Sequence, residues 1–375
     1  MKSGFVAILG RPNAGKSTLL NALTGEKVAI VSAKPQTTRN RIAGVVEVPA
    51  RKGQHPAAQI VFVDTPGVHK PGSHLDRRML QEVYEALETR DLVLVLMDAT
   101  RRVQMEEAAK PVLEDRNEVE SQVPKGEGPG APDSHAPRHE RTNWASEDEF
   151  LFGLIRKLDC PVFLLLTKID LVAKDQLLPL IDTLTRRFGF AEVIPVSARK
   201  RDGLDILTRK IIDVLPTGER FYPKDQYTDQ PQRFMVAELI RESILVETGE
   251  EVPYASAVVI ERFEEPAPFV PRKKGAVPAR LPLTRIAAAI YCERDGQKAI
   301  LIGKGGSKLK EIGTAARRQI ESLLGTRVYL ELHVIVEPNW RESKSFVESL
   351  DWRNQLERLA GDQITEKPSE EDVHR

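Results

Sequence analysis

Short apolar runs alternate with amphipathic stretches over the first 215 residues of the chain. The apolar runs span residues 5–9, 60–63, 92–97, 162–166 and 193–195. This alternation indicates strands joined by helices, which is typical of a mostly parallel sheet with helices on both faces. Two strand-like runs between residues 44 and 63 flank a polar loop, so we expect an antiparallel hairpin at this sheet. The predicted fold class of residues 3–215 is α/β.

A second pattern begins after residues 216–230, which are polar, contain two prolines and lack periodicity. We interpret them as a linker between domains. The pattern then predicts a helix at 232–248, strands at 254–262 and 281–293, a helix at 307–324 and a strand at 327–336. Residues 231–340 are therefore expected to form a second, α+β domain. Residues 341–375 carry nine acidic and six basic residues and are interpreted as a C-terminal tail.

Two segments interrupt these patterns. Residues 123–138 contain four prolines and three glycines, and a wider insertion at about 117–145 is predicted to be a disordered surface loop. The acidic residues that follow Ser146 predict a helix that begins there, with Ser146 as its N-cap. Residues 264–280 are rich in proline and basic residues and are expected to form a long loop between two strands.

Composition excludes some classes of protein but does not identify the function. Lys and Arg total 55, as do Asp and Glu, so the formal net charge is zero. This balance excludes proteins that coat nucleic acid or membranes through bulk charge. Cys160 and Cys292 are far apart, which fits a reducing cytosol, and the N-terminus does not resemble a signal peptide. No apolar run reaches the roughly 18 residues of a membrane span. We therefore expect a cytoplasmic protein.

The first chemical motif follows the first predicted strand. Residues 10–17 read GRPNAGKS and match the phosphate-binding loop GxxxxGK[ST], with a strand before it and a helix after it. Backbone N–H groups of such a loop surround the phosphates, the lysine reaches the β- and γ-phosphates, and the serine hydroxyl binds Mg²⁺. The nucleotide contacts expected here are Gly10, Asn13, Ala14, Gly15, Lys16, Ser17 and Thr18.

Three further motifs lie at strand ends, and the last two of them distinguish GTP from ATP. The strand at 60–63 ends in Asp64, Thr65, Pro66 and Gly67, where Asp64 is placed to hold Mg²⁺ and the Gly67 N–H can approach the γ-phosphate. Thr167, Lys168 and Asp170 form a [NT]KxD motif, whose aspartate accepts hydrogen bonds from guanine N1–H and its amino group. Ser197 and Ala198 follow the last strand, and the Ala198 N–H can donate to guanine O6. A site built on such bonds rejects adenine strongly.

The polar segment 34–39 lies where the first switch loop of a GTPase belongs. Thr38 is the candidate for a second hydroxyl on Mg²⁺, and Thr37 is the alternative. We expect Lys16, Thr38 and Gly67 to act in catalysis and Ser17, Thr38 and Asp64 to hold the metal. Val68 stands where many small GTPases have a glutamine that orients the attacking water, so slow hydrolysis or another way of placing the water is expected.

The second constellation lies in the C-terminal domain. Residues 303–306 read GKGG between two predicted helices, as in the loop of KH domains that clamps single-stranded RNA. Residues 294–318 contain seven basic and two acidic residues, a local net charge of +5. The residues expected to bind RNA are Gly303, Lys304, Gly305, Gly306, Lys308, Lys310 and Arg317. The alternative, a solvated basic face, would leave the glycines as an ordinary turn.

Together these motifs resemble the Era family of bacterial GTPases, a member of the TrmE-Era-EngA-like class. The likeness includes QTTR at 36–39, QRF at 232–234, ERF at 261–263 and DGQK at 295–298, and it covers about residues 4–345 outside the two insertions. It implies a P-loop GTPase domain followed by a type II KH domain. Thr167, where asparagine is commoner, and the insertions depart from the family pattern.

The resemblance also implies a role and partners. Such a protein hydrolyses GTP, binds the single-stranded 3′ end of 16S rRNA and acts in assembly of the small (30S) ribosomal subunit. The family can associate peripherally with the inner membrane, and a monomer is expected. Asn13 in the P-loop implies a K⁺ ion beside GTP, GDP and Mg²⁺. Three alternatives remain open: an RNA-bound scaffold with incidental hydrolysis, a GTPase that acts on a protein or membrane partner, and an ATP-using enzyme.

Overall fold

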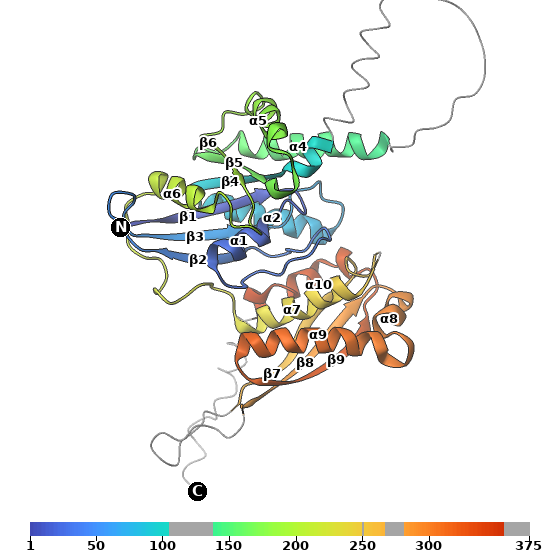
Figure 1. The fold of residues 1–375 in the computed structure, drawn as a ribbon. Helices are drawn as coiled ribbons and strands as arrows, with labels where there is room; N and C mark the ends of the chain where they lie inside the picture. Colours follow the sequence, from blue (N-terminus) through green and yellow to red (C-terminus); the bar gives the residue numbers. More distant parts are fainter. Residues whose placement is uncertain (105–137, 250, 267–280, 356–375) are drawn as a thin grey trace, which may run out of the picture. The chain divides into compact units, whose positions relative to one another are not determined.

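The computed structural model describes residues 1–104, 138–249, 251–266 and 281–355. The insertion predicted at 117–145 therefore lies mostly outside the described residues, as do most of the loop at 264–280 and the end of the predicted tail. By contacts between residues the chain divides into two compact units (Figure 1). The first unit comprises Met1–Lys27, Arg41–Lys70 and Val83–Thr228, and the second comprises Val28–Asn40, Pro71–Glu82 and Asp229–Arg375.

The first unit is built on a six-stranded sheet with the order β2-β3-β1-β4-β5-β6. The strands are β1 (Lys2–Gly10), β2 (Ile42–Val48), β3 (Ala58–Asp64), β4 (Leu92–Asp98), β5 (Val162–Thr167) and β6 (Glu192–Val196). All neighbouring pairs are parallel except β2 with β3, which forms the expected antiparallel hairpin. The predicted α/β fold class is confirmed.

Helices follow the strands of this sheet, as the alternating pattern predicted. They are α1 (Lys16–Thr24), α2 (His74–Glu88), α4 (Arg138–Ile155), α5 (Leu177–Thr185) and α6 (Leu204–Val214). Every residue of β3, β4 and β5 is buried, so both faces of the central sheet are covered. The polar loops after β1, β3, β5 and β6 all leave the carboxyl edge of the sheet, where ligands bind in folds of this kind.

One helix start differs from the prediction. Helix α4 begins at Arg138, so Ser146 lies inside the helix and is not its N-cap. Residues 138–145 contain no glycine or proline. Nothing in this segment therefore stops the helix from extending upstream of the acidic residues that suggested a start.

Residues 216–228, interpreted from sequence as a linker, belong to the first unit and lie along its sheet. Gln59 on β3 accepts hydrogen bonds from the backbone N–H groups of Phe221 and Tyr222 at 2.8 and 3.1 Å. The Val45 N–H donates to the Tyr227 carbonyl at 2.9 Å. The rings of Phe5 and Phe221 are 4.6 Å apart between centroids. These contacts hold the segment on strands β1 to β3.

The second unit contains a three-stranded sheet with the order β7-β8-β9, in which β7 and β8 are antiparallel and β8 and β9 parallel. Its elements are α7 (Gln232–Glu247), β7 (Ala257–Glu264), β8 (Leu283–Cys292), α8 (Asp295–Ile302), a 3₁₀ turn at Lys304–Gly306, α9 (Ser307–Leu324), β9 (Arg327–Val336) and α10 (Lys344–Ser349). The bounds of α9 and β9 match the predicted ones. Apolar residues of α7, α9 and the sheet form one core.

Two segments assigned from sequence to the first domain group with the second unit. Ile30 joins the core of this unit, and Leu75 and Met79 from α2 pack with Ala257 and Trp340.

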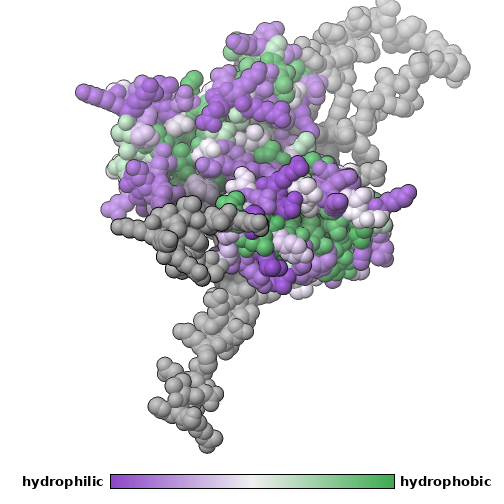
Figure 2. All heavy atoms as spheres, turned by 60° about the horizontal axis from the view of Figure 1, so that its bottom comes forward, coloured by the Kyte–Doolittle hydropathy of each residue, from purple (hydrophilic) through white to green (hydrophobic). Residues whose placement is uncertain are grey.

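Hydrophilic residues cover much of the surface seen in Figure 2, with smaller apolar patches among them. Within the described ranges, no helix has both the length and the hydropathy needed to cross a bilayer.

Candidate nucleotide-binding and RNA-binding sites

The P-loop leaves β1 at Gly10 and enters α1 at Lys16, and the DTPG segment after β3 lies directly against it. The Val68 N–H donates to the Gly10 carbonyl at 3.0 Å. A Cβ on Gly67 would lie 2.7 Å from Pro12 Cγ and 2.8 Å from Pro12 N, so only glycine fits at this close approach. The two loops therefore form one surface at the carboxyl edge of the sheet.

Lys16 is folded over the P-loop and is buried. Its Nζ donates to the carbonyls of Gly10 and Arg11 at 3.2 and 3.1 Å. Burial lowers the pKa of Lys16 to about 8, and the nearby Asp64 carboxylate offsets part of this effect. A phosphate bound beside this ammonium group would supply an opposite charge, which would stabilise the protonated form of the buried lysine.

Ser17 and Asp64 place a hydroxyl and a carboxylate side by side. The Ser17 hydroxyl donates to Asp64 Oδ2 at 2.7 Å, and Asp64 is fully buried at the end of β3. Hard oxygen ligands of this kind suit Mg²⁺, so these two residues fit the predicted metal role. Thr65 has a different task, because its hydroxyl donates to the Ile8 carbonyl at 2.8 Å and ties the DTPG segment to β1.

The TKID segment after β5 is held against the P-loop and β4. The Thr167 hydroxyl donates to the Ala14 carbonyl at 2.7 Å, so the threonine anchors the P-loop from the neighbouring strand. Lys168 has a left-handed backbone, and its Nζ donates to Asp98 Oδ2 at 2.6 Å. Asp98 was missed from sequence, although its place at the end of an apolar strand was a usable signal.

The remaining residues that were predicted to read guanine lie on adjacent strand ends. Asp170 is half-buried in a 3₁₀ turn after β5, and Ser197 and Ala198 follow β6, which pairs with β5. The Ser197 hydroxyl accepts from the Lys200 N–H at 3.2 Å, which orders this loop. The structure thus brings the P-loop, DTPG, TKID and VSA motifs together in the first unit.

The second P-loop residue is tied to α4. Arg11 forms ion pairs with Glu147 and Asp148, and the buried Asp148 also pairs with Arg102 at 2.7 Å. This network fixes the outer side of the loop to the helix that follows the insertion. The periodicity of apolar residues in the sequence does not predict this ion-pair network.

Thr38 groups with the second unit rather than with Ser17 and Asp64. Within that unit the Val31 N–H donates to Glu242 on α7 at 2.9 Å, and Arg241 of the same helix donates to the Thr37 carbonyl. Arg39 donates to the Ser256 carbonyl at 2.7 Å. Segment 28–40 therefore packs on α7 and the turn before β7. No local sequence pattern indicated these contacts.

The GKGG loop joins α8 to α9 in the second unit. Gly303, Gly305 and Gly306 all have positive φ, at 70°, 61° and 81°. A Cβ on Gly303 would lie 2.7 Å from Lys308 Cβ, whereas one on Gly305 or Gly306 would meet nothing within 4 Å. Gly303 is thus required by packing, and the two later glycines leave an open backbone that another chain can approach.

Basic side chains surround this open backbone. Lys304, Lys310 and Arg317 are exposed, and the last two lie seven residues apart on the same face of α9. Lys308 pairs with Glu311 and Glu247 on the protein itself, and the bond to Glu311 raises its pKa. Ile300, which sequence reasoning passed over, is an apolar side chain just before the loop that is 52% exposed.

Comparison with known proteins finds a matching family model in each half of the chain. Residues 5–124 match the family model of the 50S ribosome-binding GTPases, and residues 251–341 match that of the KH domain. GTPase Era of Ruminiclostridium cellulolyticum is 38% identical over 94% of this chain and 98% of its own length. That of Lacticaseibacillus paracasei is 41% identical over 93% and 96%.

The chain belongs to the Era family of GTPases. A crystal structure of an Era protein in complex with MgGDPNP and nucleotides 1506–1542 of 16S ribosomal RNA covers 93% of this chain and 98% of that one, at 36% identity and a TM-score of 0.74. A point variant of Aquifex aeolicus Era bound to GDP·AlF₄⁻ aligns over the same shares, at 35% identity and a TM-score of 0.70. The predicted family, and with it the GTPase activity, is confirmed.

Proposed function

We propose that this Era-family GTPase is a switch in which the GTP state of the first domain controls rRNA binding by the KH domain, in assembly of the 30S subunit. One observation carries the coupling. Segment 28–40, which includes Thr38, makes hydrogen bonds with α7, the first helix of the KH unit. A residue that reaches for the γ-phosphate would pull on this segment and so change its packing on the KH unit.

The nucleotide is held by the P-loop backbone, with Lys16 on the β- and γ-phosphates and Asp170 and Ala198 on the guanine. Ser17, Asp64 and, in the GTP state, Thr38 would hold Mg²⁺, which neutralises charge on the phosphates when bound. The Gly67 N–H would approach the γ-phosphate. Water attack is assisted by positioning and by these charges, since no side-chain general base is apparent among the described residues.

Two finer features follow from the same residues. Val68 cannot orient a water as glutamine does, so another group has to supply that help. Asn13 has a positive φ of 64°, which turns the P-loop sharply at this point. We assign it the role of a K⁺ ligand that supports hydrolysis.

The GKGG loop and the relative crystallised with the 3′ end of 16S rRNA both support a single-stranded rRNA as the partner. The open backbone at Gly305 and Gly306 and the exposed Lys304, Lys310 and Arg317 suit a single-stranded phosphodiester chain. A cytoplasmic monomer with a peripheral inner-membrane interaction stays a prediction. So do the domain limits 3–215, 216–230, 231–340 and 341–375.

The double substitution Lys304→Asp with Gly305→Asp tests the RNA assignment. We expect it to abolish binding of a single-stranded oligoribonucleotide of the 16S 3′ end, because it adds two negative charges and a side chain to the loop. GTP hydrolysis without RNA should be unchanged. Fluorescence anisotropy and a phosphate-release assay measure the two effects.

Lys224→Asp, at an exposed position of the first unit, is the matched control and should retain RNA binding. Intact RNA affinity in the loop variant would remove GKGG from the RNA site and favour a GTPase that acts on a protein or membrane partner. Hydrolysis that RNA does not affect in the wild-type protein would favour the scaffold alternative.

A further inference from the structure

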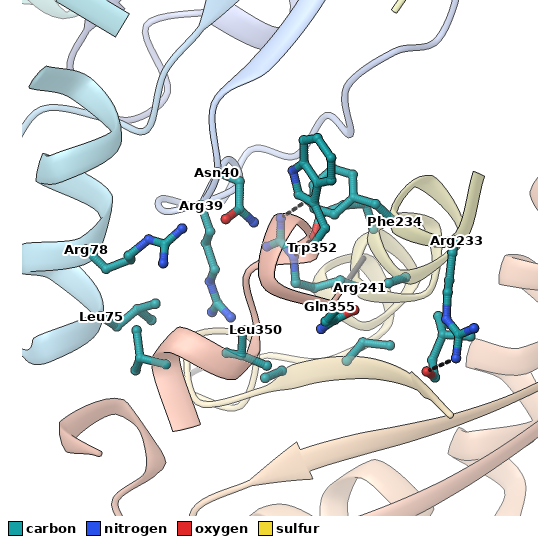
Figure 3. A pocket seen from close by; sticks show the side chains of 16 residues that line it. Arg39, Asn40, Leu75, Arg78, Arg233, Phe234, Arg241, Leu350, Trp352 and Gln355 are labelled. Carbon is teal, nitrogen blue, oxygen red and sulfur yellow. Dashed lines mark hydrogen bonds and ion pairs between the residues drawn. The ribbon is translucent and has the colours of Figure 1, made fainter. Parts of the chain in front are cut away.

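A small cavity lies in the second unit where segment 28–40, helix α7 and the residues after α10 meet. Its volume is about 50 Å³. Figure 3 shows Arg39 and Arg78 entering it from one side and Arg241 and Trp352 from the other. At about 10–15 Å³ for each water-sized group, it has room for a few such groups, the size of one phosphate rather than a nucleoside.

Four arginines line the cavity, and two of them have no carboxylate partner among the described residues. Arg78 pairs with Glu82 and Asp351, and Arg241 pairs with Glu238. Arg39 and Arg233, in contrast, form no ion pair within the part of the chain that the structure describes. Their guanidinium groups donate to backbone carbonyls instead: Arg39 to Ser256 and Tyr254, and Arg233 to Ile260 and Glu261.

Of the two arginines that form no ion pair among the described residues, Arg39 is the more deeply buried, at 7% exposed, whereas Arg233 is half-buried. Burial is the main cause that lowers its pKa, to about 9, and the nearby Arg241 charge is the second. At neutral pH the side chain is still protonated, so it is a buried cation beside the Arg241–Glu238 ion pair, and the Glu238 and Asp76 carboxylates offset only part of the lowering of its pKa. A buried charge of this kind is costly unless an opposite charge accompanies it.

Unused hydrogen-bond donors accompany this excess of charge. Arg39 Nε, Arg241 Nη1 and Trp352 Nε1 are buried atoms that have no hydrogen-bond partner among the described residues. Arg241 is 3% exposed, so its side chain has almost no contact with bulk solvent. Three N–H donors at one cavity match the several acceptor oxygens of an oxyanion.

We propose that this cavity is a binding site for a small phosphate-class oxyanion. The anion would neutralise the buried Arg39 and accept hydrogen bonds from Arg241 and Trp352. Because Arg241 holds segment 28–40 on α7 and Arg39 holds it on the turn before β7, an anion bound here would stabilise that packed arrangement.

The test is a titration of the full-length protein with inorganic phosphate after the P-loop has been saturated with Mg·GDP. The indole N–H signal of Trp352, assigned with Trp352→Phe, is followed by nuclear magnetic resonance at constant ionic strength set with chloride. We expect a saturable shift at millimolar phosphate and at least about tenfold weaker binding in Arg241→Gln. Arg209→Gln, an exposed arginine on α6, removes the same charge elsewhere and should bind as the wild type does.

Absence of a saturable shift in the wild-type protein, or an equal shift in Arg241→Gln, would overturn the proposal. If Arg241→Gln does not fold, the half-buried Arg233→Gln takes its place; we expect weaker phosphate binding in that variant too, and binding equal to the wild type would overturn the proposal. A single-stranded oligoribonucleotide forms a separate arm. If the RNA shifts the Trp352 signal and free phosphate does not, the cavity belongs to the RNA surface and the small-anion site is refuted.

Discussion

In the proposed nucleotide site, Asp170 is the residue on which a preference for guanine depends most directly. It follows β5 on the same turn as Lys168, which is braced by Asp98 at 2.6 Å. An aspartate at this place accepts two hydrogen bonds from guanine, whereas an amide places an N–H donor opposite one base N–H. The bond lost is charge-assisted and therefore strong.

We predict that Asp170→Asn weakens GTP binding about tenfold to a few hundredfold, in line with the loss of a hydrogen bond to a charged group. ATP binding should change little, so discrimination between the nucleotides falls. Competition binding with a fluorescent nucleotide measures it. Asp175→Asn, an exposed neighbour, should behave as the wild type. Unchanged discrimination in Asp170→Asn would refute the guanine assignment.

Lys16 gives a prediction about protons. Burial lowers its pKa to about 8 in the protein without nucleotide, so about half of the molecules carry a neutral lysine at pH 8. Phosphates raise the pKa again, so GTP binding at pH 8 should take up about half a proton per site. Calorimetry in buffers of different ionisation enthalpy measures the uptake. At pH 6.5 the lysine is already protonated, and uptake by this group should vanish; equal uptake at both pH values would contradict the assignment.

At the scale of elements, the regular strands and helices were predictable and the irregular segments were not. Strands β4 and β5 are continuous apolar runs, and α9 and β9 have clear periodicities, so their bounds followed from local sequence. The start of α4 did not, because acidic residues inside a helix resemble a first turn. The packing of Arg39 and Arg241 depends on residues about 200 positions apart, which no local pattern reports.

The nucleotide motifs were predictable for a related reason. Each sits at the end of a strand, so the order of the strands alone brings the motifs to one edge of the sheet. Asp98 also lies at the end of a strand, but it belongs to none of the recognised nucleotide-binding motifs. The anchoring role of Thr167 could be recognised only in the structure, where its hydroxyl donates to the Ala14 carbonyl.

Two isoleucines of the KH unit should respond oppositely to truncation. Ile300→Ala, at a 52% exposed position beside GKGG, should weaken RNA binding with little change in the free energy of unfolding. Ile320→Ala, in the fully buried core of α9, should lower that free energy by about 2–5 kcal/mol. Urea unfolding and RNA titration of both variants measure the contrast. Equal RNA affinity in Ile300→Ala and the wild type would exclude Ile300 from the RNA surface.

For the whole molecule, the net charge of zero is the sum of regions with opposite charge. The +5 stretch at 294–318 provides a local basic site, and acidic residues elsewhere balance it. In the proposed function, RNA binds through one loop and its helix rather than by bulk attraction. The two compact units are not the two sequence domains, since segment 28–40 groups with the KH unit.

That grouping couples the two sites in the proposed switch, in which the nucleotide state controls RNA affinity. The most direct measurement is the dissociation constant of a single-stranded RNA of the 16S 3′ end for the full-length protein, with Mg²⁺ and either a non-hydrolysable GTP analogue or GDP, at one salt concentration. We predict at least about fivefold tighter binding with the analogue, the lower end of typical coupling between sites. Equal dissociation constants in the two nucleotide states would contradict the account.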